Sequence, residues 1–456
     1  MFLKNIDISN YKIFKNTFNM DFNVPDGSTR GSGLTIICGE NGNGKSSILE
    51  SIALATQDYR SENFSIENIN DISQKVLINI TFSKMFDVKS FLPKKTFKAT
   101  GFSFVANKRQ RKSGTLYGSL VVSGRKIIPE TEQAEYELRC EGTTPFGAPR
   151  YAQPSILFLD KNRIYQTRKG TTTSTNFDYL LERLSLDNSS SAESCICNLD
   201  DAHPLKKAFD KFKEKFDIQL CLYSKNPLNL MENAFVASNK EANIIKLNNI
   251  GSGYEMFFSI LWAVYRSFEE EKELIILLDE PELHLHPKLQ KELISLLAEI
   301  SSKVQIIIAT HSPLFIKQLY GLNPKFHILE KENNTPLKKE IKEQKIKSFL
   351  SLNEINFMAF GLYTEEYFNE LYETLYRQAQ ESNERITFYN FDDQFFVKIK
   401  SLTADKPYRA DNDNKKVSYI TFIRNVIHHR VDYQTAGLTY TEEEFKQAID
   451  AMRSYL

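Results

Sequence analysis

Apolar and polar residues alternate over residues 2–8 and again over 18–22, which is the spacing of strands with one buried face. The two predicted strands join at Asn10-Tyr11-Lys12. Further runs rich in aromatic and β-branched residues follow between about 75 and 150, and they predict an antiparallel β lobe. These runs are Val76–Phe82, Phe97–Val105, Thr115–Val122 and Glu135–Cys140.

A second pattern is the continuous apolar run, which is typical of strands buried on both faces of a parallel sheet. Such runs occupy residues 34–38, 155–159, 274–278 and 304–309. Polar residues follow the runs, and open α/β sheets bind their ligands at the carboxyl ends of their strands. The pattern therefore predicts an α/β protein whose site lies at that edge of the sheet.

Helical periodicity over 178–186 and 205–216 predicts a helical insertion of about 170–216. The tail contains a strongly helical stretch at 364–379. Because 456 residues exceed the size at which one hydrophobic core usually stops growing, we expect two or more lobes. The predicted domains are 1–335 and a helical C-terminal domain at 336–456.

The charge balance excludes a uniformly basic protein, since the sequence has 58 Lys and Arg residues and also 58 Asp and Glu residues. Contact with nucleic acid would need a local patch. The densest patch is the predicted turn that carries Lys108, Arg109, Arg111 and Lys112. It suits either contact with a phosphate backbone or a charged hairpin tip in solvent.

Nothing in the sequence predicts a membrane segment, because no apolar run approaches the roughly 20 residues that a spanning helix needs. The first residues also lack a signal-peptide pattern. Five scattered cysteines suit reduced thiols. We therefore expect a cytoplasmic protein.

The stretch Gly39-Glu40-Asn41-Gly42-Asn43-Gly44-Lys45-Ser46 matches G-x-x-x-x-G-K-[ST] between an apolar run and a helix-like run. Its glycines let backbone N–H groups turn toward one anion at a helix N-terminus. Lys45 is expected to reach the β- and γ-phosphates of a nucleotide, and Ser46 to offer its hydroxyl to Mg²⁺. The predicted nucleotide ligands are Gly39, Asn41, Gly42, Asn43, Gly44, Lys45, Ser46 and Ser47.

Two carboxylates and a histidine follow the later buried runs. Asp279 is placed to hold Mg²⁺ together with Ser46, and Glu280 to orient and deprotonate an attacking water. His311 follows the run 304–309 and is placed to contact the γ-phosphate. Glu280 and His311 are therefore the predicted catalytic residues.

Two further motifs allow more than one interpretation. Gly251-Ser252-Gly253 precedes the helix-like run 256–268, as either a second anion site or an ordinary helix start. Glu282-Leu283-His284-Leu285-His286 has alternating histidines but lacks a third metal ligand at suitable spacing. That segment is therefore expected at a subunit contact.

The phosphate loop, Ile250–Glu255, Leu274–Glu280 and His311 together resemble the ATP-binding-cassette (ABC) ATPases of the SMC/RecF/OLD-like branch, over roughly residues 1–330. The resemblance implies an ABC-type P-loop ATPase head with a mixed central sheet, ATP and Mg²⁺ as cofactors, and a homodimer or higher homo-oligomer. It also implies that Ser252 and Gly253 of one subunit face the phosphate loop of another.

This sequence departs from the family pattern at two places. Gly251 stands where the usual L-S-G-G-Q motif has the serine that contacts the γ-phosphate. The family's glutamine loop is not evident; Phe158–Gln166 occupies the place where it is expected, and Gln166 is the candidate residue there. Long heptad arms are missing, and Asp411-Asn412-Asp413 lacks the glutamate of a Toprim nuclease, so the resemblance is to a compact head.

The tail, through residues 354–379 and 422–429, resembles the PtuA-like ATPases of Septu-type anti-phage systems. That resemblance implies a regulatory ATPase working with a separately encoded nuclease of the HNH type. Arg424 and His429 also match the R-N-x-x-x-H motif of HEPN ribonucleases. A self-contained PrrC-like ribonuclease, a RecF-like DNA-repair ATPase, and a merely structural role for Arg424 and His429 remain alternatives.

Overall fold

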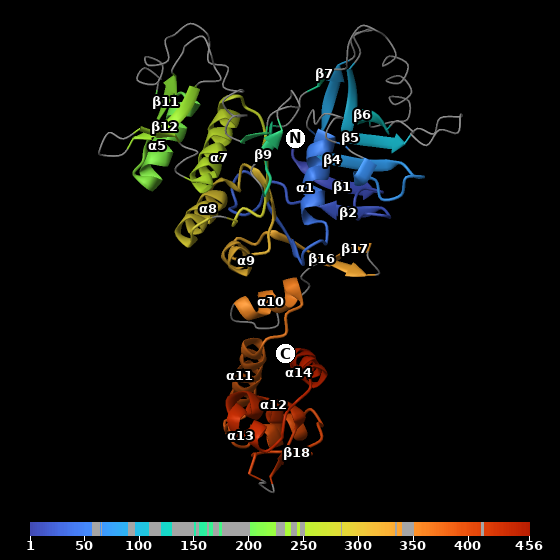
Figure 1. The fold of residues 1–456 in the computed structure, drawn as a ribbon, viewed down its shortest axis with the longest axis vertical. Coiled ribbons are helices and arrows are strands. Elements are labelled where there is room, and N and C mark those ends of the chain that lie inside the picture. Colours follow the sequence, from blue (N-terminus) through green and yellow to red (C-terminus); the bar gives the residue numbers. More distant parts are fainter. Residues whose placement is uncertain are drawn as a thin grey trace. The chain divides into compact units, whose positions relative to one another are not determined.

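The chain forms two compact units, Met1–Glu340 and Ile341–Leu456, each described by itself below (Figure 1). The structure is a computed structural model. It describes residues 1–56, 64, 66–89, 96–108, 120–129, 150–151, 155–161, 164–166, 173–175, 201–224, 233–238, 244–246, 251–283, 285–332, 335–339, 351–411 and 415–456.

The first unit is built on a six-stranded mixed sheet with the order β17-β16-β3-β15-β14-β8. All neighbours are parallel except β16 and β17. Every residue of β3, β14 and β15 is buried, as their continuous apolar runs predicted. The bounds are β3 Leu34–Gly39, β8 Ser155–Leu159, β14 Leu274–Asp279, β15 Gln305–Ala309, β16 Lys325–Glu332 and β17 Thr335–Lys339.

A second sheet is antiparallel and has the order β2-β1-β4-β5-β6, with β7 paired to β4. The N-terminal hairpin belongs to this β lobe and not to the central sheet, because β1 pairs with β4. The end of the run predicted at Thr115–Val122 belongs to β6, whereas residues 115–119 and Glu135–Cys140 lie outside the described residues. The bounds are β1 Leu3–Ser9, β2 Phe18–Asp21, β4 Val76–Lys89, β5 Thr96–Lys108, β6 Leu120–Pro129 and β7 Arg150–Tyr151.

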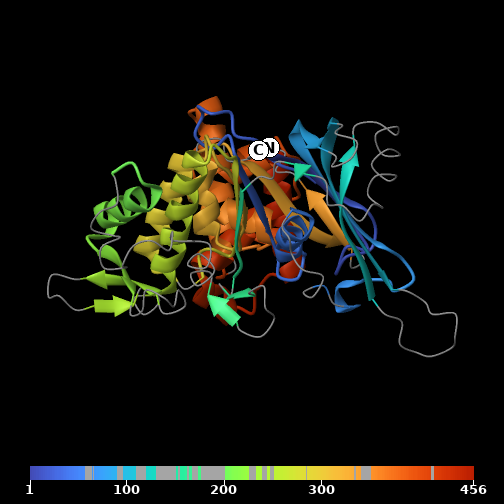
Figure 2. The ribbon, with the colours of Figure 1, turned by 90° about the horizontal axis from the view of Figure 1, so that it is seen from above.

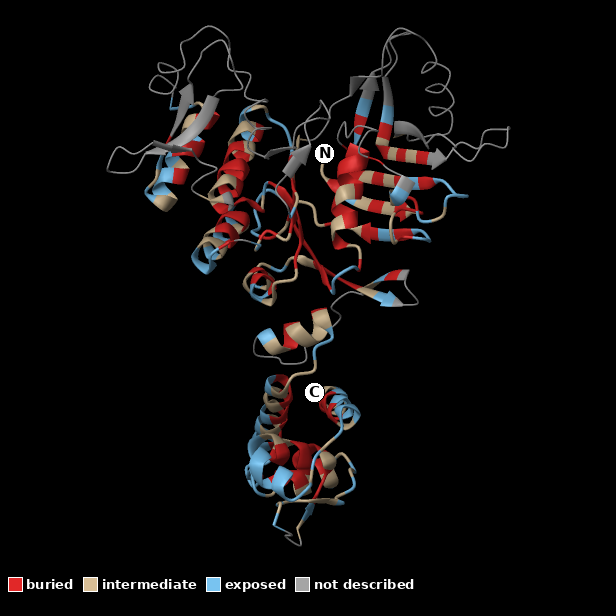
Figure 3. Ribbon diagram, in the orientation of Figure 1, coloured by how far each residue is buried: buried red, intermediate tan, exposed pale blue. Residues whose placement is uncertain are grey.

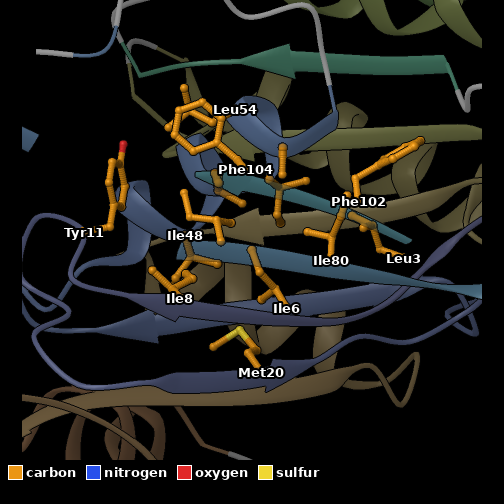
Figure 4. Close-up of a cluster of buried hydrophobic side chains, with 14 of the residues drawn as sticks. Leu3, Ile6, Ile8, Tyr11, Met20, Ile48, Leu54, Ile80, Phe102 and Phe104 are labelled. Atoms are coloured by element: carbon orange, nitrogen blue, oxygen red, sulfur yellow. The ribbon is translucent and has the colours of Figure 1, made fainter. Parts of the chain in front are cut away.

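Helix α1 (Lys45–Thr56) is packed between these two sheets. Ten of its twelve residues are buried, so it has no solvent face. Figure 4 shows Ile48 and Leu54 of α1 among the apolar side chains of the β lobe, and Figure 3 shows the burial of α1 and the central strands. This packing fixes the start of α1, and with it the phosphate loop, against the central sheet.

The other face of the central sheet carries α7 (Ser252–Glu269), so α1 and α7 lie on opposite sides of the strands (Figure 2). Helix α5 (Pro204–Phe216) packs on α7 through aromatic rings, with the Phe209 and Phe258 centroids 5.5 Å apart. The predicted helix at 178–186 lies outside the described residues. Remaining elements are η2 Ile66–Asn68, β9 Ile164–Gln166, β10 Thr173–Thr175, β11 Gln219–Ser224, β12 Asn233–Ser238, β13 Ile244–Lys246, α8 Pro287–Ile300 and α9 Pro313–Tyr320.

The second unit is mainly helical and has an aromatic core that includes Tyr367, Phe368, Phe391 and Phe396. The bounds are α10 Leu352–Phe360, α11 Glu365–Ser382, a π-helical turn Asp392–Val397, β18 Lys406–Pro407, β19 Lys416–Val417, α12 Tyr419–His428, α13 Arg430–Thr435 and α14 Glu442–Tyr455. Helices α10, α11, α12 and α14 begin at side-chain caps, since Ser351, Thr364, Ser418 and Thr441 each accept a hydrogen bond from the backbone N–H of the residue three positions later.

The predicted fold class is confirmed: an α/β head with a mixed central sheet, an antiparallel β lobe and a helical C-terminal region. The division of the chain falls after Glu340, whereas the sequence-based boundary at 335 lies inside β17. Strands β16 and β17 were not predicted from the apolar pattern, because both carry several charged residues. Across the described stretches, no helix has the length and hydrophobicity needed to cross a bilayer.

Candidate active site

The parallel strands β3, β14 and β15 bring three loops to one edge of the central sheet. Ile37 pairs with Ala309, and Ala309 pairs with Asp279, so the strands end level with one another. The phosphate loop follows β3, Asp279 and Glu280 close β14, and Thr310-His311-Ser312 follows β15. The structure therefore gathers the residues predicted from three distant parts of the sequence.

The phosphate loop needs glycine where its backbone meets neighbouring elements closely. Gly39 has φ +136°, and a Cβ there would lie 2.3 Å from the Leu329 carbonyl oxygen. Gly44 has φ +95°, and its Cβ would lie 2.7 Å from Ile13. The loop leads directly into α1, whose first turn carries no acidic residue to compete for an anion.

Lys45 is buried beneath this loop. Its Nζ donates to the carbonyl oxygens of Gly39 and Glu40, both at 2.8 Å. Burial lowers the pKa of Lys45 to about 8, although the negative charge of Glu280 opposes the shift. A phosphate group near Lys45 would favour its charged form.

Ser46 and Asp279 meet across the site. The Ser46 hydroxyl donates to Oδ1 of Asp279 at 3.0 Å. Burial raises the pKa of Asp279 to about 6, the Ser46 hydrogen bond opposes this shift, and the charge of Glu280 adds to it. A hydroxyl and a carboxylate held together are oxygen ligands of the kind Mg²⁺ takes, so this pair fits a Mg²⁺ site.

Glu280 and His311 form the second pair. His311 Nε2 lies 3.5 Å from Oε1 of Glu280. Glu280 has φ +46°, and its backbone N–H donates to the Ala309 carbonyl at 2.8 Å, which ties it to β15. Burial lowers the pKa of His311 and the charge of Lys45 lowers it further, while Glu280 opposes them. The imidazole is therefore mainly neutral at pH 7.

Sequence reasoning missed the part that Glu282 has in the site. Its Oε1 accepts hydrogen bonds from Oγ1 of Thr310 at 2.6 Å and from the backbone N–H groups of His311 at 3.0 Å and Ser312 at 3.1 Å. Its place two residues after Glu280 was visible in the sequence. The partners were not, because they lie 28 to 30 residues further along the chain.

The predicted ligands Asn43 and Ser47 are buried, whereas Asn41 is exposed. The Asn43 side-chain amide donates to the Leu329 carbonyl at 2.7 Å, so it anchors the phosphate loop to β16. Lys161, at the end of the β8 segment, lies near enough for its charge to lower the pKa of both Asp279 and His311. Sequence reasoning had not singled out this cation.

The Gly251-Ser252-Gly253 motif opens α7, which begins at Ser252. A Cβ on Gly253 would lie 2.4 Å from Leu285, so glycine lets α7 pack against the segment that follows Asp279. His286 caps α8 by accepting a hydrogen bond from the Lys288 N–H at 3.3 Å. The facing of Ser252 and Gly253 toward another subunit stays a prediction.

Two further candidates are only partly covered by the structure. Lys108 ends β5, whereas Arg109, Arg111 and Lys112 lie outside the described residues. Gln166 ends β9, a strand paired with β10. Nucleic-acid contact by the basic turn and a glutamine-loop role for Gln166 therefore stay predictions.

In the second unit, Arg424 is held by aromatic rings. Its guanidinium lies 4.3 Å from the centroid of Phe388, and its Nη1 donates to Oδ1 of Asn425 at 3.3 Å. The Asn425 amide in turn donates to the Tyr408 carbonyl. His429 is exposed just beyond α12, and within the described part of this unit no hydrogen bond joins it to Arg424.

Comparison with known proteins bears on these features. A family model described as an AAA ATPase domain matches residues 1–127 and 151–316. The Septu protein PtuA of Bacillus mycoides (strain KBAB4) is 24% identical over 98% of this chain, and that of Bacillus thuringiensis is 25% identical over 66% of it. The Retron Vc95 probable ATPase of Vibrio cholerae is 24% identical over 73% of it. The resemblance to Septu-type ATPases is thus confirmed.

The aligned parts differ in how much of each relative they cover. The match spans 53% of the Bacillus mycoides protein, 70% of the Bacillus thuringiensis protein and 76% of the retron protein. Among solved structures, an SMC head bound to the C-terminal winged-helix domain of ScpA matches with 14% identity and a TM-score of 0.44. That match covers 75% of this chain and 98% of the SMC head. The SMC head domain of Thermotoga maritima matches with 13% identity and a TM-score of 0.37, over 75% of this chain and 100% of that domain.

Proposed function

This chain belongs to the AAA ATPase domain family, and from that membership we propose that it binds ATP with Mg²⁺ and hydrolyses ATP. One observation carries the proposal. A buried Lys45, a Ser46–Asp279 pair and a Glu280–His311 pair meet at the carboxyl ends of β3, β14 and β15. Phosphoryl transfer needs cation, metal and water-orienting groups around one phosphate, and these residue types supply each of them.

In this proposal, the phosphate loop binds the nucleotide. Its N–H groups and the N-terminus of α1 hold the phosphates, and Lys45 contributes a positive charge. Ser46 and Asp279 would hold Mg²⁺, which supplies neutralisation of the phosphate charge. Asp279 binds as the ionised carboxylate, and a nearby cation favours that form against the burial that raises its pKa.

Hydrolysis falls to Glu280 and His311. Glu280 orients a water for attack on the γ-phosphate and accepts its proton. His311 lies 3.5 Å from Glu280 and, as a neutral imidazole, can donate one hydrogen bond to a phosphate oxygen. The Glu280 backbone is fixed to β15, so the base keeps its place relative to His311.

The assembly follows from the family resemblance. We propose that two copies of the chain complete one ATP site, with Ser252 and Gly253 of one copy facing the phosphate loop of the other. Both segments open helices, and helix N-termini favour anions, which supports the arrangement.

The biological setting follows from the relatives. Because the curated proteins that match this chain include two Septu PtuA proteins and a retron ATPase, we propose a regulatory ATPase of a cytoplasmic anti-phage system. Its ATP-dependent dimer or oligomer state would control a separately encoded nuclease, with the HNH type favoured. The stacking of Arg424 on Phe388 supports a structural role for that residue over a ribonuclease centre in the tail.

The test of hydrolysis is the change Glu280→Gln. The amide keeps the size of the side chain but cannot accept a proton, so ATP turnover should fall at least ~100-fold while ATP binding persists. Steady-state phosphate release and equilibrium binding of a fluorescent ATP analogue measure the two effects. An unchanged turnover rate in the variant would remove Glu280 from the proposed role.

A further inference from the structure

The Glu282 side chain is hydrogen-bonded to the loop that carries His311. One carboxylate oxygen, Oε1, accepts three hydrogen bonds from consecutive residues: Thr310 Oγ1 at 2.6 Å, His311 N at 3.0 Å and Ser312 N at 3.1 Å. The backbone of His311 is therefore fixed at its own N–H and on both sides. A carboxylate that accepts such bonds forms stronger contacts than a neutral oxygen would.

Burying the Glu282 carboxyl group costs solvation free energy. Burial raises the pKa of Glu282, while the hydrogen bonds from Thr310 and His311 oppose the shift. Its second oxygen, Oε2, is buried, and among the described residues it has no hydrogen-bond partner. Leaving a buried acceptor unpaired destabilises a fold. The three hydrogen bonds to Oε1 offset this cost, so the carboxylate depends on the loop after β15 as much as that loop depends on it.

The turn that carries Glu282 also carries Glu280. The backbone N–H of Leu283 donates to the Glu280 carbonyl at 3.0 Å, so residues 280–283 form one closed turn after β14. Its first residue faces His311 Nε2 at 3.5 Å, and its third holds the His311 backbone. The same turn thus places the proposed base and sets the position of the imidazole beside it.

We propose that Glu282 is a positioning residue that acts through His311, an inference that rests on the proposed ATP hydrolysis. It does not touch the nucleotide. Its three hydrogen bonds fix the loop after β15 so that the imidazole stays beside Glu280 and can reach the γ-phosphate. Helix α9 begins directly after this loop, with Ser312 as its cap, so the bonded segment is short and stiff.

A double-mutant cycle with His311 tests this role. Glu282→Ala should leave the Kd for ATP within about 3-fold and lower kcat on the order of 100-fold, the scale of an ångström-sized misplacement. In the His311→Ala background the same change should slow turnover by less than about 2-fold, because a residue that acts through His311 has nothing left to position. Glu282→Gln keeps an accepting oxygen and should recover most of the rate.

The matched control is Glu292→Ala on α8, whose carboxylate pairs with Lys215 away from this loop and should leave kcat unchanged. If Glu282→Ala lowers the melting temperature, the cycle is repeated with Thr310→Val, which removes one of the three donors while keeping the side-chain volume. Equal slowing in the wild-type and His311→Ala backgrounds, with either variant, overturns the proposal. So does a fully active Glu282→Ala.

The experiment distinguishes loss of the proposed ATP hydrolysis from loss of the positioning role of Glu282. If the wild type does not hydrolyse ATP, or if Glu280→Gln turns over at the wild-type rate, the proposed function fails. If wild type is active, Glu280→Gln is inactive and the Glu282 changes are additive with His311→Ala, only the positioning role fails.

Discussion

At the scale of single residues, burial moves four ionisable groups of the site toward their neutral forms. It lowers the pKa values of Lys45 and His311 and raises those of Asp279 and Glu282. A partner of opposite charge stabilises the ionised form of such buried groups strongly, because solvent screens their interactions only weakly. A nucleotide with its metal ion is such a partner, and its binding should reverse the shifts of Lys45 and Asp279.

Outside the site, His327 on β16 is a buried residue whose pKa is lowered in the folded protein. It is fully buried, and its Nε2 lies 2.7 Å from the Asp21 carbonyl. Burial lowers its pKa from 6.5, and the hydrogen bond to Asp21 opposes the shift. Asp21 also pairs with Lys325 and Lys338; burial alone would raise the pKa of this carboxyl, but those two lysines hold it below its ordinary value.

These shifts predict how stability depends on pH. The folded state keeps His327 neutral while the unfolded chain takes up a proton near pH 6.5, so this contribution is present above 6.5 and is lost as pH falls below it. The urea midpoint should therefore drop between about pH 7.5 and 5.5, and drop less in His327→Gln, which keeps an N–H donor but does not titrate. Fluorescence of Trp262, the one tryptophan, reports the transition. Equal drops in both proteins would contradict the assignment.

The predicted site residues that the structure brings together share one property. Lys45, Ser46, Asp279, Glu280 and His311 sit in short motifs or directly after apolar runs, so local pattern places them at the sheet edge. The contacts of Asn43 with Leu329 and of Glu282 with Thr310 cross 286 and 28 residues of sequence. No local pattern encodes such pairs, so only the folded chain reveals them.

At the scale of elements, prediction succeeded where a strand is buried on both faces. Strands β3, β14 and β15 carry few polar residues, such as Thr35 and Gln305, and no charged residue before Asp279, whereas β16 begins with Lys325 and carries His327 two residues later. These two side chains are accommodated because they contact Asp21 of β2. The missed strands thus reflect contacts between two sheets that the sequence pattern does not show.

Helix α12 provides the test of the ribonuclease alternative. If Arg424 is structural, Arg424→Ala should lower the melting temperature by several degrees, because it removes a cation–π contact worth about 1 kcal/mol. The exposed His429 should tolerate replacement by Asn. Neither change should alter ATP turnover, and total tRNA incubated with protein and ATP should stay intact. Cleavage of tRNA by the wild type that disappears in His429→Ala would establish the ribonuclease instead.

At the scale of the whole molecule, we propose that ATP is hydrolysed between two copies of the chain. A single chain holds the phosphate loop and the Gly251-Ser252-Gly253 loop at the starts of α1 and α7, on opposite sides of its central sheet (Figure 1). We propose that these two helix N-termini meet at one nucleotide only when two copies of the chain associate, with the phosphate loop of one copy facing the Gly251-Ser252-Gly253 loop of the other. A second copy would bring them together, and ATP binding would then control assembly.

Mixing two inactive variants tests this claim most directly. Lys45→Ala disables the phosphate loop, and Ser252→Arg blocks the facing loop, so each protein alone should hydrolyse almost no ATP. Random exchange at equal amounts gives mixed dimers with one intact site each, and phosphate release should recover to about a quarter of the wild-type rate. Native mass spectrometry confirms that subunits have exchanged. Recovery across mixing ratios supports a shared site, whereas no recovery despite verified exchange would contradict it.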